Sequence, residues 1–95
     1  MDFASTLAAL RRKSATTCYK LSQWSGFSEP YIYRLENRER TGPSRDVVIM
    51  LGLALARNGS SVEIWDVDEL LLSAGYAPLT RRGEADRRRS ARGPE

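Results

Sequence analysis

The side chains best suited to chemistry at a surface lie in the segment GFSEPYIYRLENRER, residues 26–40. Apolar Ile32 and Leu35 are three positions apart, which places both on one face of a helix. Arg34, one turn after Pro30, must then project from the outer face. A guanidinium there can donate two hydrogen bonds to O6 and N7 of a guanine, although a surface arginine paired with a nearby carboxylate fits the same pattern.

The other polar residues of the segment have two interpretations each. Tyr31 and Tyr33 are expected to divide, so that one contacts sugar, phosphate or a thymine methyl group and the other packs on the side of the fourth helix. Glu36, next to a buried leucine, is expected to pair with a nearby arginine. The neighbouring cations are expected to contact phosphates rather than base edges, and each alone is equally explained as solvated surface. They are Lys20, Arg38, Arg40 and Arg45.

Catalytic and metal chemistry have few candidates. The chain has no histidine and one cysteine, Cys18, so neither a metal site nor an internal disulfide is expected. There is no paired nucleophile and base and no glycine loop suited to phosphates, so no enzyme activity and no cofactor are predicted. Cys18 has no adjacent basic cluster to lower its pKa, which favours a small residue at a helix start over a redox switch.

Length and composition indicate one soluble domain. The longest apolar run, residues 47–56, is too short to span a bilayer, and the N-terminus lacks the features of a signal peptide, so a cytoplasmic protein is expected. Residues 1–45 carry eight basic and four acidic side chains, whereas residues 46–79 carry one and five. This asymmetry predicts a polyanionic partner for one face, and a solubilising surface with chance asymmetry is the alternative.

Helical periodicity and capping signals predict an all-α fold of five helices without strands. The domain is expected to span residues 1–79. Residues 80–95 hold six arginines and no apolar residue beyond two alanines, so they are expected to be a disordered Arg-rich tail. The expected helices are 3–13, 18–25, 29–37, 45–57 and one that begins between 61 and 66 and ends at 74, with Asp2, Thr17, Ser28 and Ser44 as N-caps.

Residues 17–37 have the spacing of a helix-turn-helix, in which the second helix projects its polar face outward. Pro30 falls in the first turn of that second helix, where a missing N–H is harmless. A small residue at Ser22 permits close crossing, and Gly26 permits a turn that needs positive φ. The expected buried set is Leu21, Ser22, Gly26, Phe27, Ile32 and Leu35.

On these residues the chain resembles the phage-repressor/Cro-like (XRE-type) helix-turn-helix family. The resemblance covers roughly residues 3–79 and rests on KLSQWSGFSEPYIYRLENRER, on the loop that ends at Pro43 and on DELLLSAGYAPL. It implies a five-helix bundle of the phage-repressor DNA-binding type, usually dimeric, that binds palindromic operators with its third helix in the major groove. It also implies that Thr17 lies against the phosphate backbone and that Ser28, Glu29, Tyr31, Tyr33, Arg34 and Asn37 face the DNA.

The chain departs from the family pattern at three places. Cys18 stands where a phosphate-binding Gln is common, and Ser25 stands where an apolar residue is usual. Glu29 and Pro30 replace polar amides or basic residues at the tip of the recognition helix. Glu29 can accept a hydrogen bond from a cytosine amino group or complement the helix dipole, and both roles remain open.

The last predicted helix has more apolar residues than one helix face can bury. Either these residues wrap the core completely or some of them form a homodimer interface, and the sequence does not separate the two. The candidates for the interface are Leu70, Leu72, Tyr76 and Leu79.

The sequence thus predicts a transcriptional regulator that binds double-stranded DNA, with dimeric repression by operator occupancy as the expected mechanism. The alternative is a protein-interaction module, such as an antitoxin or a regulatory subunit, in which the Tyr-rich face binds a protein partner. Salt-dependent duplex binding would support the first, and a stable hetero-complex without DNA binding would support the second.

Overall fold

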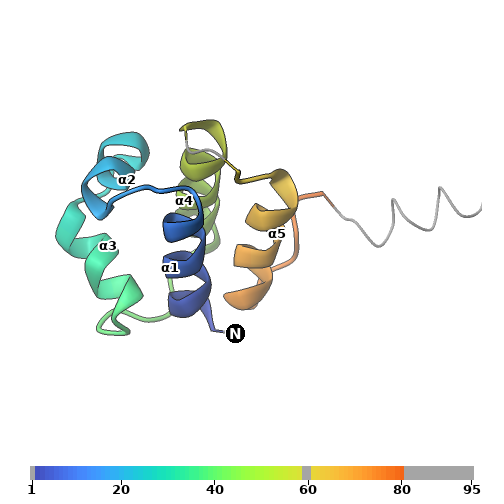
Figure 1. The fold of residues 1–95 in the computed structure, drawn as a ribbon. Coiled ribbons are helices and arrows are strands. Elements are labelled where there is room, and N and C mark those ends of the chain that lie inside the picture. The colour runs from blue at the N-terminus through green and yellow to red at the C-terminus, as the bar shows by residue number, and fades with distance from the viewer. Residues whose placement is uncertain (1, 59–60, 81–95) are drawn as a thin grey trace, which may run out of the picture.

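The computed structural model describes residues 2–58 and 61–80, which form five α-helices and no β-strand, as the sequence predicts (Figure 1). Most of the expected tail, from residue 81 onward, lies outside the described residues. None of the helices described is long and apolar enough to cross a membrane. The helices are α1 (Phe3–Lys13), α2 (Cys18–Ser25), α3 (Glu29–Glu36), α4 (Arg45–Asn58) and α5 (Ile64–Ser73), each within one residue of its expected bounds.

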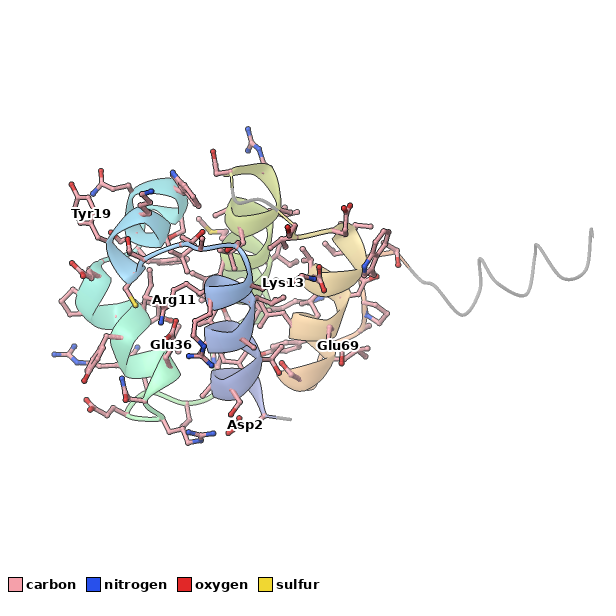
Figure 2. All side chains as sticks on the ribbon, in the orientation of Figure 1. Asp2, Arg11, Lys13, Tyr19, Glu36 and Glu69 are labelled. Carbon is pink, nitrogen blue, oxygen red and sulfur yellow. The ribbon has the colours of Figure 1, made fainter. Side chains whose placement is uncertain are left out.

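The four predicted N-caps are confirmed. Each side chain accepts a hydrogen bond from the backbone N–H three residues later, which satisfies a donor that the helix itself leaves unpaired. Figure 2 shows Asp2 at the start of α1. The bonds join Asp2 to Ser5 (3.0 Å), Thr17 to Lys20 (3.0 Å), Ser28 to Tyr31 (3.2 Å) and Ser44 to Val47 (3.2 Å).

The turn between α2 and α3 is built around Gly26 at φ +85°, as predicted, but Gly26 is exposed rather than buried, because the turn faces solvent. Its N–H donates to the carbonyl of Ser22 at 3.0 Å and ends α2. Ser25, at a position where an apolar residue is usual, is buried, and its hydroxyl accepts from the N–H of Phe27 at 3.3 Å. The space around Gly26 is open, so a side chain there would strain the backbone without crowding the two helices.

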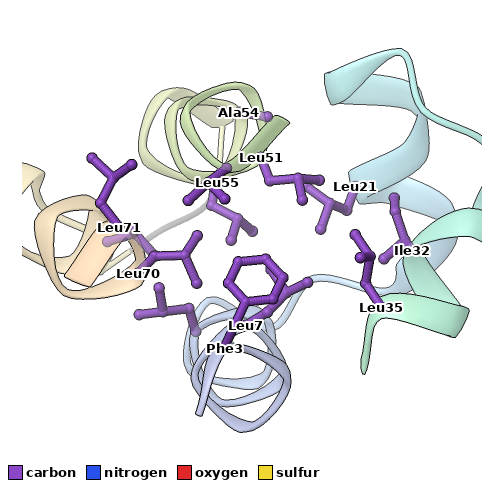
Figure 3. Packing of buried hydrophobic residues seen from close by; sticks show 13 residues of the cluster. Phe3, Leu7, Leu21, Ile32, Leu35, Leu51, Ala54, Leu55, Leu70 and Leu71 are labelled. Carbon is purple, nitrogen blue, oxygen red and sulfur yellow. The ribbon is translucent and has the colours of Figure 1, made fainter. Parts of the chain in front are cut away.

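The core lies between the helices, and every helix contributes to it (Figure 3). α4 packs against α2 and α5, while α1 packs against α3 and α5. α3 is joined to the rest through α1 and α2, so one of its sides faces outward. The largest fully buried apolar side chains are Leu7, Leu21, Ile32, Leu35, Val48, Leu51, Leu55, Val67, Leu70 and Leu71.

The structure shows which apolar residues of and after the last helix belong to the core and which stay available for a homodimer interface. Leu70 is fully buried, so its side chain is enclosed by its own core and is not exposed to a second copy. Tyr76 and Leu79 are partly buried and pack against the same core. Leu72 is 51% exposed and is the one candidate interface residue whose side chain lies mainly at the surface.

The segment after α5 is held to the domain by a buried carboxylate. Asp68 is fully buried and accepts from the N–H of Leu79 at 2.8 Å and from the hydroxyl of Thr80. The hydroxyl of Tyr76 donates to the carbonyl of Pro43 at 2.7 Å, in the loop after α3. Thr80, expected to begin the tail, is therefore bonded to the domain.

α4 and α5 approach closely at Gly52. A Cβ added there would lie 2.7 Å from Cγ1 and 3.4 Å from Cβ of Val67. Val67 is β-branched and fully buried, so it has little freedom to move aside. The glycine is thus required by the distance between two helices rather than by its backbone angles.

We predict that Gly52→Ala lowers the melting midpoint by about 4–8 °C, because overpacking of about 1–3 kcal/mol exceeds the helix propensity gain of about 1 kcal/mol. Thermal melts with and without Gly52→Ala, in the wild-type and Val67→Ala backgrounds, measure the coupling between the two positions. In the Val67→Ala background the added methyl has space, so the same change should raise the midpoint. A Gly52→Ala substitution that stabilises both backgrounds would show that the helices do not meet there.

Candidate nucleic-acid interface

The exposed side of α3 presents two adjacent rows of side chains, most of them polar. Glu29, Tyr33 and Asn37 follow one another at intervals of four residues, and Pro30 and Arg34 form the neighbouring row. All five are exposed, whereas Ile32 and Leu35 on the opposite side are in the core. In Figure 1, α3 lies at one edge of the bundle and α5 at the other. The outward face of α3 is therefore unobstructed by the rest of the described chain.

The two tyrosines of α3 differ in exposure, as predicted, and the ring contact of the half-buried one is with Phe27. Tyr33 is 57% exposed. Tyr31 is half-buried against the core, with its ring centroid 5.4 Å from that of Phe27. The guanidinium carbon of Arg40 lies 5.4 Å from the centroid of Tyr31, within the range of a cation–π interaction. Tyr31 thus positions Arg40, and Tyr33 is the tyrosine available to a ligand.

Arg34 is exposed, and within residues 2–58 and 61–80 no carboxylate forms an ion pair with it. The alternative of an arginine paired with a neighbouring carboxylate is therefore not observed for this side chain. Asn37 at the end of α3 donates its amide to the carbonyl of Tyr33 at 2.8 Å. This bond holds the amide group beside the Arg34 row.

Arg38 differs from the expectation of a phosphate-binding arginine. Its guanidinium donates to both carboxylate oxygens of Asp2, at 2.7 and 3.0 Å, and to the hydroxyl of Ser5 at 2.8 Å. The hydrogen bonds from Arg38 and Ser5 hold the pKa of Asp2 well below its usual value. Arg38 in this conformation joins the loop after α3 to the start of α1 through a bidentate pair with a carboxylate.

The remaining cations predicted to contact phosphate are exposed. None of the three ion pairs in the described chain includes Lys20, Arg40 or Arg45. Lys20 lies in the first turn of α2, Arg40 in the loop after α3, and Arg45 at the start of α4. The hydroxyls of Thr17 and Ser28 accept capping hydrogen bonds, and each retains its proton for donation to a ligand.

The predicted pairing of Glu36 with an arginine is confirmed, and the arginine comes from α1. Arg11 donates from Nε and Nη2 to the two oxygens of Glu36 at 2.6 and 2.9 Å (Figure 2). Its Nη1 also donates to the carbonyl of Thr16 at 3.1 Å. The side chains of Arg11 and Glu36 are only 19% and 9% exposed. This pair fixes α3 to α1 on the side that faces away from solvent.

Cys18, beside this pair, is a half-buried free thiol. Burial, and then the negative charge of Glu36, raise the pKa of the thiol above its usual value. A raised pKa leaves the neutral form dominant at neutral pH, which agrees with a packing role rather than a reactive one.

Within the described ranges no group of three or more His, Cys, Asp or Glu side chains is arranged to hold a metal ion. Comparison of the chain with protein-family models, with curated proteins and with solved structures finds no match. The geometry of α3 and its surroundings is therefore the basis on which a function is assigned.

We predict that Glu36→Gln lowers the free energy of unfolding by about 1–3 kcal/mol, because Arg11 is left largely buried without its charged partner. Arg38→Gln, which breaks the exposed pair with Asp2, should cost less, because solvent screens an ion pair at the surface. Urea denaturation of the two variants gives the comparison. Equal losses would mean that the Arg11–Glu36 pair does not hold α3 more strongly than a surface contact.

Proposed function

We propose that this protein is a sequence-specific regulator that binds double-stranded DNA and inserts the exposed face of α3 into the major groove. The observation that carries the proposal is Arg34, exposed and free of an ion pair in the described chain, on a helix at the edge of the bundle. Such a helix fits a groove about 12 Å wide. The arrangement supports a helix-turn-helix of the phage-repressor type.

In this proposal the contacts divide by chemistry. Base edges are read by the exposed face of α3, where Arg34 donates to guanine and Tyr33 and Asn37 contact neighbouring bases. Phosphates are held by the cations around that face and by the start of α2, since positive side chains and helix N-termini both attract phosphate oxygens. The proposed phosphate contacts are Thr17, Lys20, Ser28, Arg40 and Arg45.

Repression by a homodimer requires a surface through which two copies associate, and α5 offers such a surface. Leu72 is 51% exposed, and on the same helix Trp65 is 54% and Ile64 is 40% exposed. Exposed apolar side chains on one helix favour association, and α5 lies at the opposite edge from α3, so pairing there would leave both recognition helices free. Sedimentation of wild type and Leu72→Glu tests this part: the variant should be the more monomeric.

The rival function is a protein-interaction module, favoured by the large exposed area of Tyr33 beside Glu29. Selection of binding sites from a random duplex library, followed by titration across a salt series, separates the two. If the protein is a DNA-binding regulator, the selection should enrich a palindromic site. Binding to that site releases cations from the phosphates, so the affinity should fall as the salt concentration rises. No enriched duplex, together with a stable hetero-complex, would support the rival.

We predict that Arg34→Ala weakens binding to the selected site by about 1–3 kcal/mol and relaxes the preference at one base pair. Arg57→Ala removes the same charge from the exposed end of α4 and serves as the matched control. Titration of both variants with the selected duplex and with single-pair changes gives the result. If the two variants lose affinity equally at every sequence, Arg34 acts through charge alone and does not read a base.

A further inference from the structure

A shallow hollow of about 320 Å³ lies where the starts of α2 and α3 meet. Cys18, Glu29, Pro30 and Tyr33 line it. Three of the four offer apolar surface, namely a thiol, a pyrrolidine ring and a phenol ring. The carboxylate of Glu29 is the one charged group of the lining. The hollow belongs to the face proposed to enter the major groove.

This lining restricts which base edge can occupy the hollow. A carboxylate accepts hydrogen bonds and repels other acceptors. In the major groove guanine presents two acceptors, thymine presents an acceptor beside its methyl group, and adenine presents an acceptor next to its donor. Cytosine alone presents an amino donor with no acceptor beside it, and its neighbouring C5 position carries a hydrogen or a methyl group. The lining therefore matches cytosine in both its polar and its apolar part.

We propose that this hollow reads a cytosine, with Glu29 accepting from the N4 amino group and with Cys18, Pro30 and Tyr33 packing around C5. The inference rests on the proposed binding of DNA and specifies one base that the protein selects. A methyl group on C5 is directed into the apolar part of the hollow, so 5-methylcytosine binds at least as tightly as cytosine. Glu29 is then a specificity-determining residue rather than only a partner of the helix dipole.

The neutral state of the thiol is consistent with this packing. Burial raises the pKa of Cys18, so an uncharged sulfur lines the hollow at neutral pH. A neutral thiol behaves as a small apolar group and packs favourably against a methyl.

The test begins with the duplex selected by the full-length protein. Each C·G pair of the site is replaced in turn by T·A and by 5-methylcytosine·G, and affinities are measured for wild type and Glu29→Gln. Wild type should lose about tenfold or more at one pair on exchange to T·A, whereas Glu29→Gln should bind both nearly equally, because an amide can donate to O4 of thymine. Methylation at that pair should tighten wild-type binding by up to about fourfold, the value of one buried methyl group.

Two further variants separate the hollow from general effects. Glu39→Gln removes the same charge from the exposed loop after α3, outside the hollow, and should keep the wild-type preference for cytosine. Cys18→Leu fills the apolar part and should abolish the gain from methylation while the preference for cytosine over thymine remains. Thermal melts of each variant verify that it is folded before its affinities are compared.

The outcomes distinguish this inference from the function on which it rests. If a duplex is enriched, and exchange of each C·G pair changes the affinity of wild type and of Glu29→Gln equally, then the protein does not read cytosine through Glu29. That result would leave DNA binding intact. A loss of affinity on methylation would equally overturn the reading of cytosine. Failure to enrich any duplex would instead refute the proposed function itself, and loss of a protein complex in Glu29→Gln would assign the hollow to a protein ligand.

Discussion

The bidentate pair between Arg11 and Glu36 is the contact on which the position of α3 depends. α3 has eight residues and places only Ile32 and Leu35 fully in the core, so apolar burial alone gives a short helix a small anchor. The planar guanidinium meets both oxygens of the carboxylate, which restricts rotation of α3 as well as its distance from α1. With its inner side held in this way, the outer side of the helix is free to bind a ligand.

The division of charges between the two edges of the bundle supports the same interpretation. Two acids at this edge are paired within the domain, since Glu36 pairs with Arg11 and Asp2 pairs with Arg38, whereas Glu29 on α3 is exposed. Lys20, Arg34 and Arg45 are left exposed near α3. Acidic Glu63 and Glu69 are exposed instead on and beside α5 at the opposite edge. A polyanion is therefore attracted to one edge and repelled by the other.

Local features of the fold could be predicted from the sequence, whereas contacts between distant residues could not. Caps such as Ser28 and the turn at Gly26 depend on neighbours within four residues, so their chemistry is visible in the letters. The pairing of Arg38 with Asp2 joins residues 36 apart, and no periodicity indicates it. The same applies to the close approach of Gly52 to Val67 and to the buried Asp68, whose partners are set by how α4, α5 and the chain end pack.

The proposed role of α3 is tested most directly by mapping amide chemical shifts of the full-length protein as the selected duplex is added, with a scrambled duplex of equal length as control. The selected duplex should shift the amides of α3 and of the first turns of α2 and α4 most strongly, and those around Glu69 on α5 least. The scrambled duplex should produce smaller shifts that vanish as salt is raised. Shifts that centre on α5, or that are the same for both duplexes, would contradict insertion of α3 into the groove.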